Sequence, residues 1–168
     1  MSNLGIFASQ KFHIHMEKNK KKGRYERIYH QLRELTAKSQ DADARMATIA
    51  AVLHHKMECF FWTGFYMLRD GELIVRTYQG PVACQILEKH KGVCWAGIDG
   101  GKTVVVGDVH LFPGHIACDS RSNSEIVVPV KDGSGKVLGV LDVDSKEKGS
   151  FDDTDAEWLE KIVELILR

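Results

Sequence analysis

One cysteine in this sequence lies in a polar, glycine-containing loop, where a thiol is accessible and can react. Cys118 stands between Pro113-Gly114-His115-Ile116-Ala117 and Asp119-Ser120, and a β-rich segment beginning near Glu125 follows. Loop amides and polar neighbours stabilise a thiolate, whereas burial among apolar side chains raises the pKa of a thiol and keeps it inert. The loop therefore predicts that Cys118 is a nucleophilic or redox-active thiol.

Two of the other three cysteines also occupy loop-like positions. Cys84 follows Gly80-Pro81-Val82-Ala83, and Cys94 stands between Gly92-Val93 and Trp95-Ala96-Gly97. Cys59 lies instead in an apolar run, where a free cysteine usually packs as a small hydrophobe. Three thiols at loop-like positions favour thiol and disulfide chemistry.

Zinc binding is the competing interpretation of these thiols. Structural zinc sites favour closely spaced cysteine pairs such as Cys-x-x-Cys, and the sequence contains no such pair. The nearest candidate ligand set is Cys118 with His115 and His110. This spacing fits zinc poorly, so we expect no metal site.

Carboxylates and aromatic side chains recur on two strand-like segments. In the segment 137–144, alternation places Asp142 and Asp144 on one face with aliphatic neighbours, where carboxylates need a cation, a shared proton or donors. The alternative is that this strand frays and both aspartates are hydrated. In the segment 60–68, Trp62 and Tyr66 share a face, which suits either core packing or a pocket for a polar, thioether-like ligand.

Residue periodicity predicts the elements that position these side chains. Apolar steps of three and four residues indicate a helix over 25–39 and a second one after Asp41 or Asp43, and Asp152 is expected to cap a closing helix. A short helix is expected over 94–98, and strands over 60–68, 73–78, 103–109, 126–131 and 137–144. This pattern predicts an α+β domain with an antiparallel sheet of five to six strands, flanked by N- and C-terminal helices.

Length and composition limit the classes of function. A chain of 168 residues favours one domain, and 23 basic residues balance 23 acidic ones, so no net charge favours nucleic acid or an anionic membrane. Residues 1–24 show no sustained periodicity, which predicts a flexible extension before a domain over 25–168. The basic run 18–24 lacks the interleaved aromatics typical of a nucleic-acid site. The absence of a signal-like or membrane-length apolar run predicts a cytoplasmic protein with a small-molecule partner.

Several segments resemble one enzyme family, and they occur in the same order. They are Trp62-Thr63-Gly64-Phe65-Tyr66, Val82-Ala83-Cys84, Gly92-Val93-Cys94, Gly114-His115-Ile116-Ala117-Cys118-Asp119, Ser124-Glu125-Ile126-Val127-Val128-Pro129 and Gly139-Val140-Leu141-Asp142-Val143-Asp144-Ser145. They closely resemble the free methionine-(R)-sulfoxide reductases, which are small GAF-domain enzymes. The likeness runs from about Met46 to the last residue and includes all three loop cysteines.

The resemblance implies a single GAF-like domain that reduces free L-methionine-(R)-S-oxide to methionine without a cofactor. It implies Cys118 as the nucleophile, which becomes a sulfenic acid, and either Cys84 or Cys94 as the thiol that resolves it to a disulfide. Thioredoxin is then the implied final reductant, and a homodimer is common. This sequence departs from the family pattern at Trp95 and in the charged segment 88–91, both beside Cys94.

Sulfoxide reduction needs a nucleophile and an acid, since the sulfoxide oxygen must be protonated as charge develops. Glu125 and the pair Asp142 and Asp144 are the candidate acids, because clustered carboxylates raise one another's pKa. The same acids could bind the substrate's α-ammonium group, while Trp62 and Tyr66 contact its methyl-sulfur end. Two alternatives stay open, a non-catalytic GAF module that senses a small ligand and a redox sensor whose disulfide is the signal.

Overall fold

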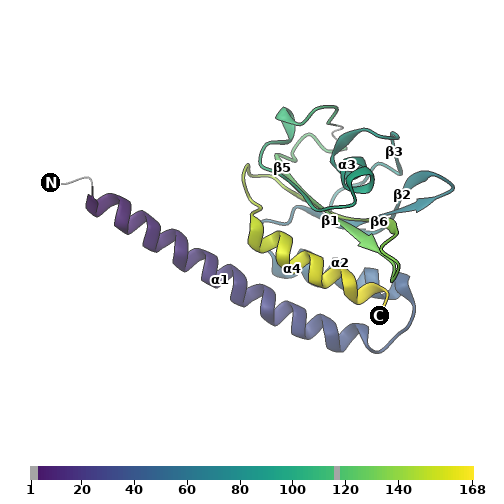
Figure 1. Ribbon diagram of the computed structural model, residues 1–168, viewed down its shortest axis with the longest axis horizontal. Coiled ribbons are helices and arrows are strands. Elements are labelled where there is room, and N and C mark those ends of the chain that lie inside the picture. Colours follow the sequence, from purple (N-terminus) through teal and green to yellow (C-terminus); the bar gives the residue numbers. More distant parts are fainter. Residues whose placement is uncertain (1–3, 116–117) are drawn as a thin grey trace.

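The computed structural model describes residues 4–115 and 118–168, and the side chains of residues 18–115 and 118–168. Six antiparallel strands form one sheet in the order β3-β2-β1-β6-β5-β4 (Figure 1). The elements are α1 (Leu4–Thr36), α2 (Ala42–Lys56), β1 (Trp62–Arg69), β2 (Glu72–Gln79), β3 (Ile86–Leu87), α3 (Gly92–Gly100), β4 (Val104–Val106), β5 (Ser124–Lys131), β6 (Val137–Ser145) and α4 (Asp153–Val163), with 3₁₀ turns η1 (Val109–Leu111) and η2 (Glu164–Ile166). The predicted α+β class with an antiparallel sheet is confirmed.

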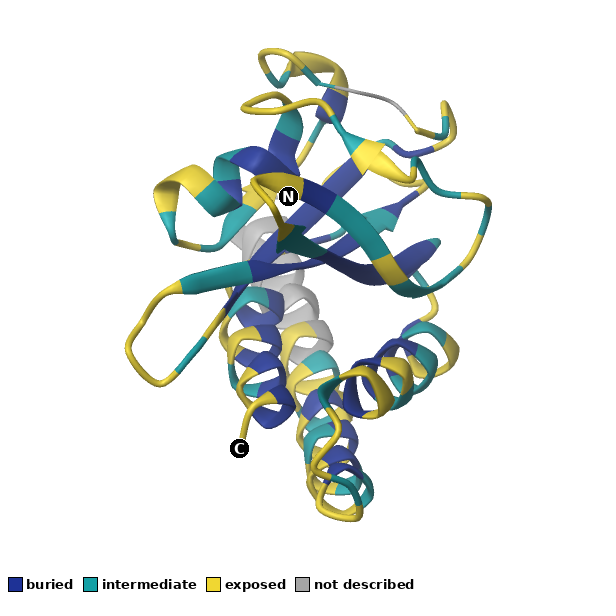
Figure 2. Cartoon of the chain, turned by 90° about the vertical axis from the view of Figure 1, so that its right-hand side faces the viewer, coloured by how far each residue is buried: buried dark blue, intermediate teal, exposed yellow. Residues whose placement is uncertain are grey.

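Three helices cover one face of the sheet. Helices α1, α2 and α4 lie together beneath the strands, and the residues between the helices and the sheet are buried (Figures 1 and 2). Leu53 from α2, Phe65 from β1 and Leu159 from α4 are each fully buried there. This helix-covered core supports the sheet from below and leaves the opposite face for a site.

Helix α1 begins much earlier than its apolar pattern predicts. The apolar positions Tyr25, Ile28 and Leu32 are buried as expected, but the helix extends back to Leu4 and crosses the predicted domain boundary at residue 25. Lysine is a good helix former and recurs over residues 18–22, so the helix propagates there without an apolar stripe. The flexible character proposed for residues 1–24 stays a prediction.

The last turns of the predicted extension are fixed to α4. The ammonium group of Lys21 pairs with Asp152 at 3.2 Å and also with Asp155, which is fully buried. The Tyr25 hydroxyl donates a hydrogen bond to the Asp155 carboxylate at 2.7 Å. Asp155 also accepts from the backbone of Asp152, which completes a capping box at the start of α4.

Turn and cap chemistry accounts for the other predicted boundaries. Asp41 caps α2 and accepts a hydrogen bond from the Ala44 amide at 2.8 Å. The turn between β1 and β2 holds Asp70 and Gly71 at φ of 52° and 80°, as a tight hairpin with an Asp-Gly pair requires. The two-residue strand β3 and the turn η1 were not predicted, because neither has a periodic pattern.

Strand register brings the chemically active side chains together on the free face. Trp62 pairs with Asp144 across β1 and β6, and Glu125 pairs with Asp144 across β5 and β6. Alternation sends Phe65 and Leu141 to the helix-covered core, and Tyr66 and Asp142 to the other face. Helix α3 and the connecting loops cover this second face (Figure 1).

In the described part of the chain no helix is long and apolar enough to span a membrane.

Candidate functional site

A pocket lies on the second face of the sheet, between the strands, the first turn of α3 and the loop that holds Cys118. Seven of the eight predicted site residues line it: Trp62, Tyr66, Cys94, Cys118, Glu125, Asp142 and Asp144. The eighth, Cys84, is covalently joined to the pocket wall. Residues on five separate segments, β1, α3, the Cys118 loop, β5 and β6, therefore converge on one cavity.

A disulfide bond joins Cys84 to Cys118 at the edge of this pocket. The two Cα atoms are 5.6 Å apart, and the bond connects the loop after β2 to the loop before β5. Cys118 is exposed and Cys84 is half-buried, so solvent and other molecules can reach the bond. Ile116 and Ala117 of the predicted nucleophile loop lie outside the described residues.

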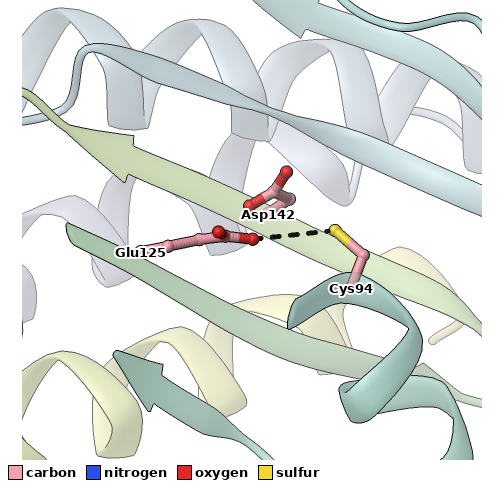
Figure 3. Close-up of side chains that lie close together, drawn as sticks. All are labelled: Cys94, Glu125 and Asp142. Atoms are coloured by element: carbon pink, nitrogen blue, oxygen red, sulfur yellow. Dashed lines mark hydrogen bonds between the residues drawn. The ribbon is translucent and has the colours of Figure 1, made fainter. Parts of the chain in front are cut away.

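Cys94 lies in a different environment from the disulfide pair. The residue lies in the first turn of α3, where a short helix over 94–98 was predicted, but only 4% of it is exposed, which its loop-like neighbours did not indicate. Its thiol points toward the Glu125 carboxyl group, with 3.9 Å between Sγ and Oε1 (Figure 3). Burial, followed by the charges of Asp142 and Glu125, raises the pKa of this thiol well above its usual value. Cys94 is therefore held as a protonated thiol.

The three predicted acids form a buried cluster beside Cys94. Glu125 and Asp142 are 6% and 7% exposed, and Asp144 is partly buried. Burial raises the pKa of Glu125 and of Asp144 well above the usual range, with the charge of Asp142 adding to it, and burial raises the pKa of Asp142 to about 6. The alternative of hydrated aspartates is thus excluded for Asp142.

No positive charge compensates this cluster within the described residues. None of the ion pairs found there includes Glu125, Asp142 or Asp144. Oδ1 of Asp142 has no hydrogen-bond partner in the described part of the chain. A buried carboxyl group without a neighbouring cation favours its protonated form, and a cationic ligand that binds beside it favours the ionised form.

The three ligating atoms of Cys94, Glu125 and Asp142 lie within 4.8 Å of one another, which is compatible with a metal ion. Among the described residues this is the one group with such spacing. It differs from the set of Cys118, His115 and His110 that the sequence analysis considered.

Two aromatic rings form the apolar side of the pocket. Trp62 stacks on Tyr66 with ring centroids 5.7 Å apart and on Tyr78 at 5.3 Å. The polar hydrogens of Trp62 and Tyr66 are donated to backbone carbonyls, the indole to that of Pro81 and the hydroxyl to that of Cys84. The pocket therefore receives the faces and edges of these rings.

Ser122 and His115 line the pocket but were not among the predicted site residues. Ser122 is 7% exposed, and its hydroxyl lowers the pKa of Asp144 through a hydrogen bond, against the larger effect of burial. His115 lines the pocket with Nε2 buried and without a partner among the described residues. Serine and histidine in a polar loop are too common to be singled out from sequence alone.

Cys59 lies apart from this pocket and packs against the helix-covered core. Burial raises the pKa of its thiol, so it is a poor nucleophile. We expect Cys59→Ala to form the Cys84–Cys118 disulfide normally and to lose at most about 1 kcal/mol of unfolding free energy. Thiol mapping and urea unfolding would check this, and failure of a folded variant to form the disulfide would contradict it.

Comparison with known proteins identifies the fold family. A GAF domain model matches residues 39–167. GAF domain-containing protein A of Dictyostelium discoideum is 40% identical over 154 residues, which cover 91% of this chain and 96% of that protein. The free methionine-R-sulfoxide reductase of Escherichia coli is 39% identical over 120 residues, covering 71% of this chain and 72% of the relative.

A solved structure agrees with the sequence relatives. Free methionine-R-sulfoxide reductase from Neisseria meningitidis, in complex with its substrate, superposes with a TM-score of 0.81 at 41% identity, covering 85% of this chain and 86% of the other. The sequence segments that include the three loop cysteines had already indicated this relationship. The chain belongs to the GAF domain family, in the group that includes the free methionine-R-sulfoxide reductases.

Proposed function

We propose that this protein reduces free methionine-(R)-sulfoxide to methionine through a thiol cycle recycled by thioredoxin. The observation that carries the proposal is the Cys84–Cys118 disulfide beside a pocket whose inner wall is a cluster of buried carboxyl groups. A reductase of this kind needs a nucleophile, an acid and a resolving thiol within one site. The names of the Escherichia coli and Neisseria meningitidis relatives support the choice of substrate.

In the first step the Cys118 thiolate attacks the sulfoxide sulfur. Glu125 delivers a proton to the sulfoxide oxygen, since burial and the charge of Asp142 raise its pKa and favour the protonated carboxyl group. This attack forms a bond between the two sulfur atoms. As the protonated oxygen moves to the Cys118 sulfur, the S–O bond and the bond between the two sulfur atoms both break, and methionine leaves. Cys118 is then a sulfenic acid, which carries the oxidising equivalents of the substrate.

In the second step a neighbouring thiol reduces the sulfenic acid. Cys84 attacks the Cys118 sulfur, a disulfide forms, and the oxygen leaves as water. Cys84 suits this role because it lies within disulfide distance of Cys118, whereas Cys94 is buried against Glu125 with a raised pKa. Thioredoxin then attacks the exposed disulfide and restores both thiols by exchange.

The acid cluster also explains a preference for the free amino acid. Burial raises the pKa of Asp142 and of Asp144, and a substrate α-ammonium group would favour their ionised forms and pair with the carboxylates. The faces of Trp62 and Tyr66 can hold the methyl-sulfur end, since sulfur and aromatic rings attract one another. A blocked amino group cannot make the ionic contact.

Thioredoxin-coupled turnover of both epimers of free methionine sulfoxide tests this proposal. We expect oxidation of reduced thioredoxin with the R epimer, and weak activity with the S epimer, with N-acetylmethionine sulfoxide and with a blocked peptide sulfoxide. Equal turnover of free and acetylated substrates would refute ammonium recognition. No turnover of any sulfoxide by the fully reduced protein would refute the reductase.

The two candidate resolving cysteines can be separated by paired serine variants. Cys84→Ser should release one equivalent of methionine, accumulate Cys118 sulfenic acid and stall with thioredoxin, because no disulfide can form. Cys94→Ser should still form the Cys84–Cys118 disulfide. Mass spectrometry with a sulfenic-acid trap would measure both, and a Cys94–Cys118 disulfide in the wild-type cycle would reverse the assignment.

A further inference from the structure

The loop that carries Cys84 is attached to two aromatic side chains of β1. The Trp62 indole donates a hydrogen bond to the Pro81 carbonyl at 3.1 Å. The Tyr66 hydroxyl donates to the carbonyl of Cys84 itself at 3.0 Å. Both rings belong to the buried cluster on this face of the sheet and are 6% and 2% exposed. A rigid part of the sheet thus holds the backbone on either side of Val82.

The backbone at the start of this loop is packed directly against Trp62. Gly80 has φ of 118° and passes so close that an added Cβ would lie 2.8 Å from the Phe61 carbonyl oxygen and 3.1 Å from the Trp62 ring. Gly64 provides space for the same ring, since a Cβ there would lie 2.5 Å from it. Two glycines therefore allow the indole to lie between the strand and the loop.

The loop has few other attachments in the described structure. Val82, at its centre, is 84% exposed, and the following strand β3 contains only two residues. One backbone hydrogen bond, from the Val75 amide to the Gln85 carbonyl at 2.9 Å, fixes the residue after Cys84. The position of the Cys84 sulfur consequently depends on the two side-chain donors from β1.

We infer that Tyr66 and Trp62 are positioning residues that hold Cys84 ready to close the disulfide with Cys118. This inference rests on the proposed thiol cycle and adds a second task to two side chains that also line the pocket. Both side chains were predicted either to pack in the core or to contact the substrate, but their polar hydrogens are donated to the Cys84 loop. The hydroxyl of Tyr66 acts through the backbone of Cys84 and not on the reacting sulfur.

The chemical step that this arrangement assists is the condensation of a thiol with a sulfenic acid. The Cys84 thiolate attacks the sulfur of Cys118, the S–S bond forms, and the S–O bond breaks. The departing hydroxide takes up the proton that the thiol lost and leaves as water, so no further reductant is needed. A fixed Cys84 raises the effective concentration of one thiol at the other, because less loop freedom is lost at closure.

Tyr66→Phe tests the inference, since it removes the hydrogen bond and keeps the ring. We expect the dithiol–disulfide equilibrium, measured against a dithiothreitol redox buffer, to shift toward the dithiol by roughly 3- to 10-fold, the range of one hydrogen bond. Closure after oxidation of Cys118 should slow by a similar factor, with more sulfenic acid trapped by dimedone. Trp62→Phe, which removes the second donor, should shift both measurements in the same direction.

Tyr78→Phe is the matched control. Tyr78 stacks on Trp62 in the same cluster, but no described hydrogen bond joins its hydroxyl to the loop that holds Cys84. This variant should keep the wild-type equilibrium and closure rate. If Tyr66→Phe and Tyr78→Phe shift the dithiol–disulfide equilibrium equally, the cause is a general loosening of the aromatic cluster, and the positioning role is overturned.

The redox equilibrium uses no sulfoxide, so it separates this inference from the proposed function. A protein without sulfoxide turnover but with the Tyr66→Phe shift would refute the reductase and retain the positioning role. An active reductase with an unchanged equilibrium and unchanged trapping in Tyr66→Phe would refute the positioning role alone. Slower methionine release with normal closure would likewise overturn it, since the hydroxyl would then act on the substrate.

Discussion

Cys118→Ser is expected to abolish reduction of free methionine-(R)-sulfoxide, with a loss of about a thousandfold or more in kcat/KM. A serine hydroxyl is a poor nucleophile without a dedicated base, and it cannot store the oxygen as a sulfenic acid. The variant also leaves Cys84 without its disulfide partner. Single-turnover methionine release and thiol counting would measure both losses.

The fold should tolerate this change. Cys118 is an exposed residue at the edge of the pocket, so serine removes no buried packing. Its unfolding midpoint should be compared with that of the wild type under reducing conditions, where neither protein has the disulfide. Methionine release at the wild-type rate by Cys118→Ser would remove Cys118 from the mechanism.

The sequence predicted the side chains that meet in the pocket better than it predicted their environments. Alternation along β1 and β6 places Trp62 and Tyr66 on one face with Asp142, since a strand has a period of two whatever surrounds it. The burial of these side chains could not be predicted in the same way, because it depends on how α3 and the loops, which have no regular sequence pattern, cover the sheet. The short helix over 94–98 was therefore predicted, but the burial of Cys94 within it was not.

The start of α1 could not be predicted for a related reason. Its apolar stripe begins at Tyr25, where the helix first packs on α4, and the turns before it have no such stripe. The contact that fixes Lys21 is with Asp155, which is far away in the sequence. Similarly, the partner of Cys118 could not be chosen between Cys84 and Cys94 until the loop after β2 was placed.

Glu125→Gln is expected to lower single-turnover methionine release by about a hundredfold or more. General acid catalysis contributes roughly 10²–10⁴-fold, and glutamine keeps the shape and a donor but cannot deliver a proton.

Asp144→Asn or Asp142→Asn should chiefly raise KM, because loss of a charge-assisted hydrogen bond costs about 1.5–3 kcal/mol, or roughly ten- to more than a hundredfold in kcat/KM. Rapid-quench kinetics with each amide variant would separate kcat from KM.

The pH dependence of single-turnover methionine release should identify Glu125 as the group that delivers the proton. Burial raises the pKa of Glu125, so the native protein holds this proton more tightly than the unfolded chain does. Methionine release should therefore fall as pH rises through the raised pKa of Glu125, and Glu125→Gln should lose that part of the pH dependence. A wild-type profile retained in Glu125→Gln would assign the proton to another group.

The unfolding stability of Glu125→Gln shows whether the Glu125 carboxyl group serves catalysis or supports the fold. A carboxyl group with a raised native pKa favours folding at low pH, and this advantage disappears as pH increases from the unfolded pKa through the native one. At alkaline pH the wild type must therefore bury mutually repelling charges beside Asp142, and Glu125→Gln should unfold at an equal or higher urea concentration. If Glu125→Gln instead loses stability and activity together across the pH range, the carboxyl group supports the fold, and the proton donor must be sought elsewhere in the pocket.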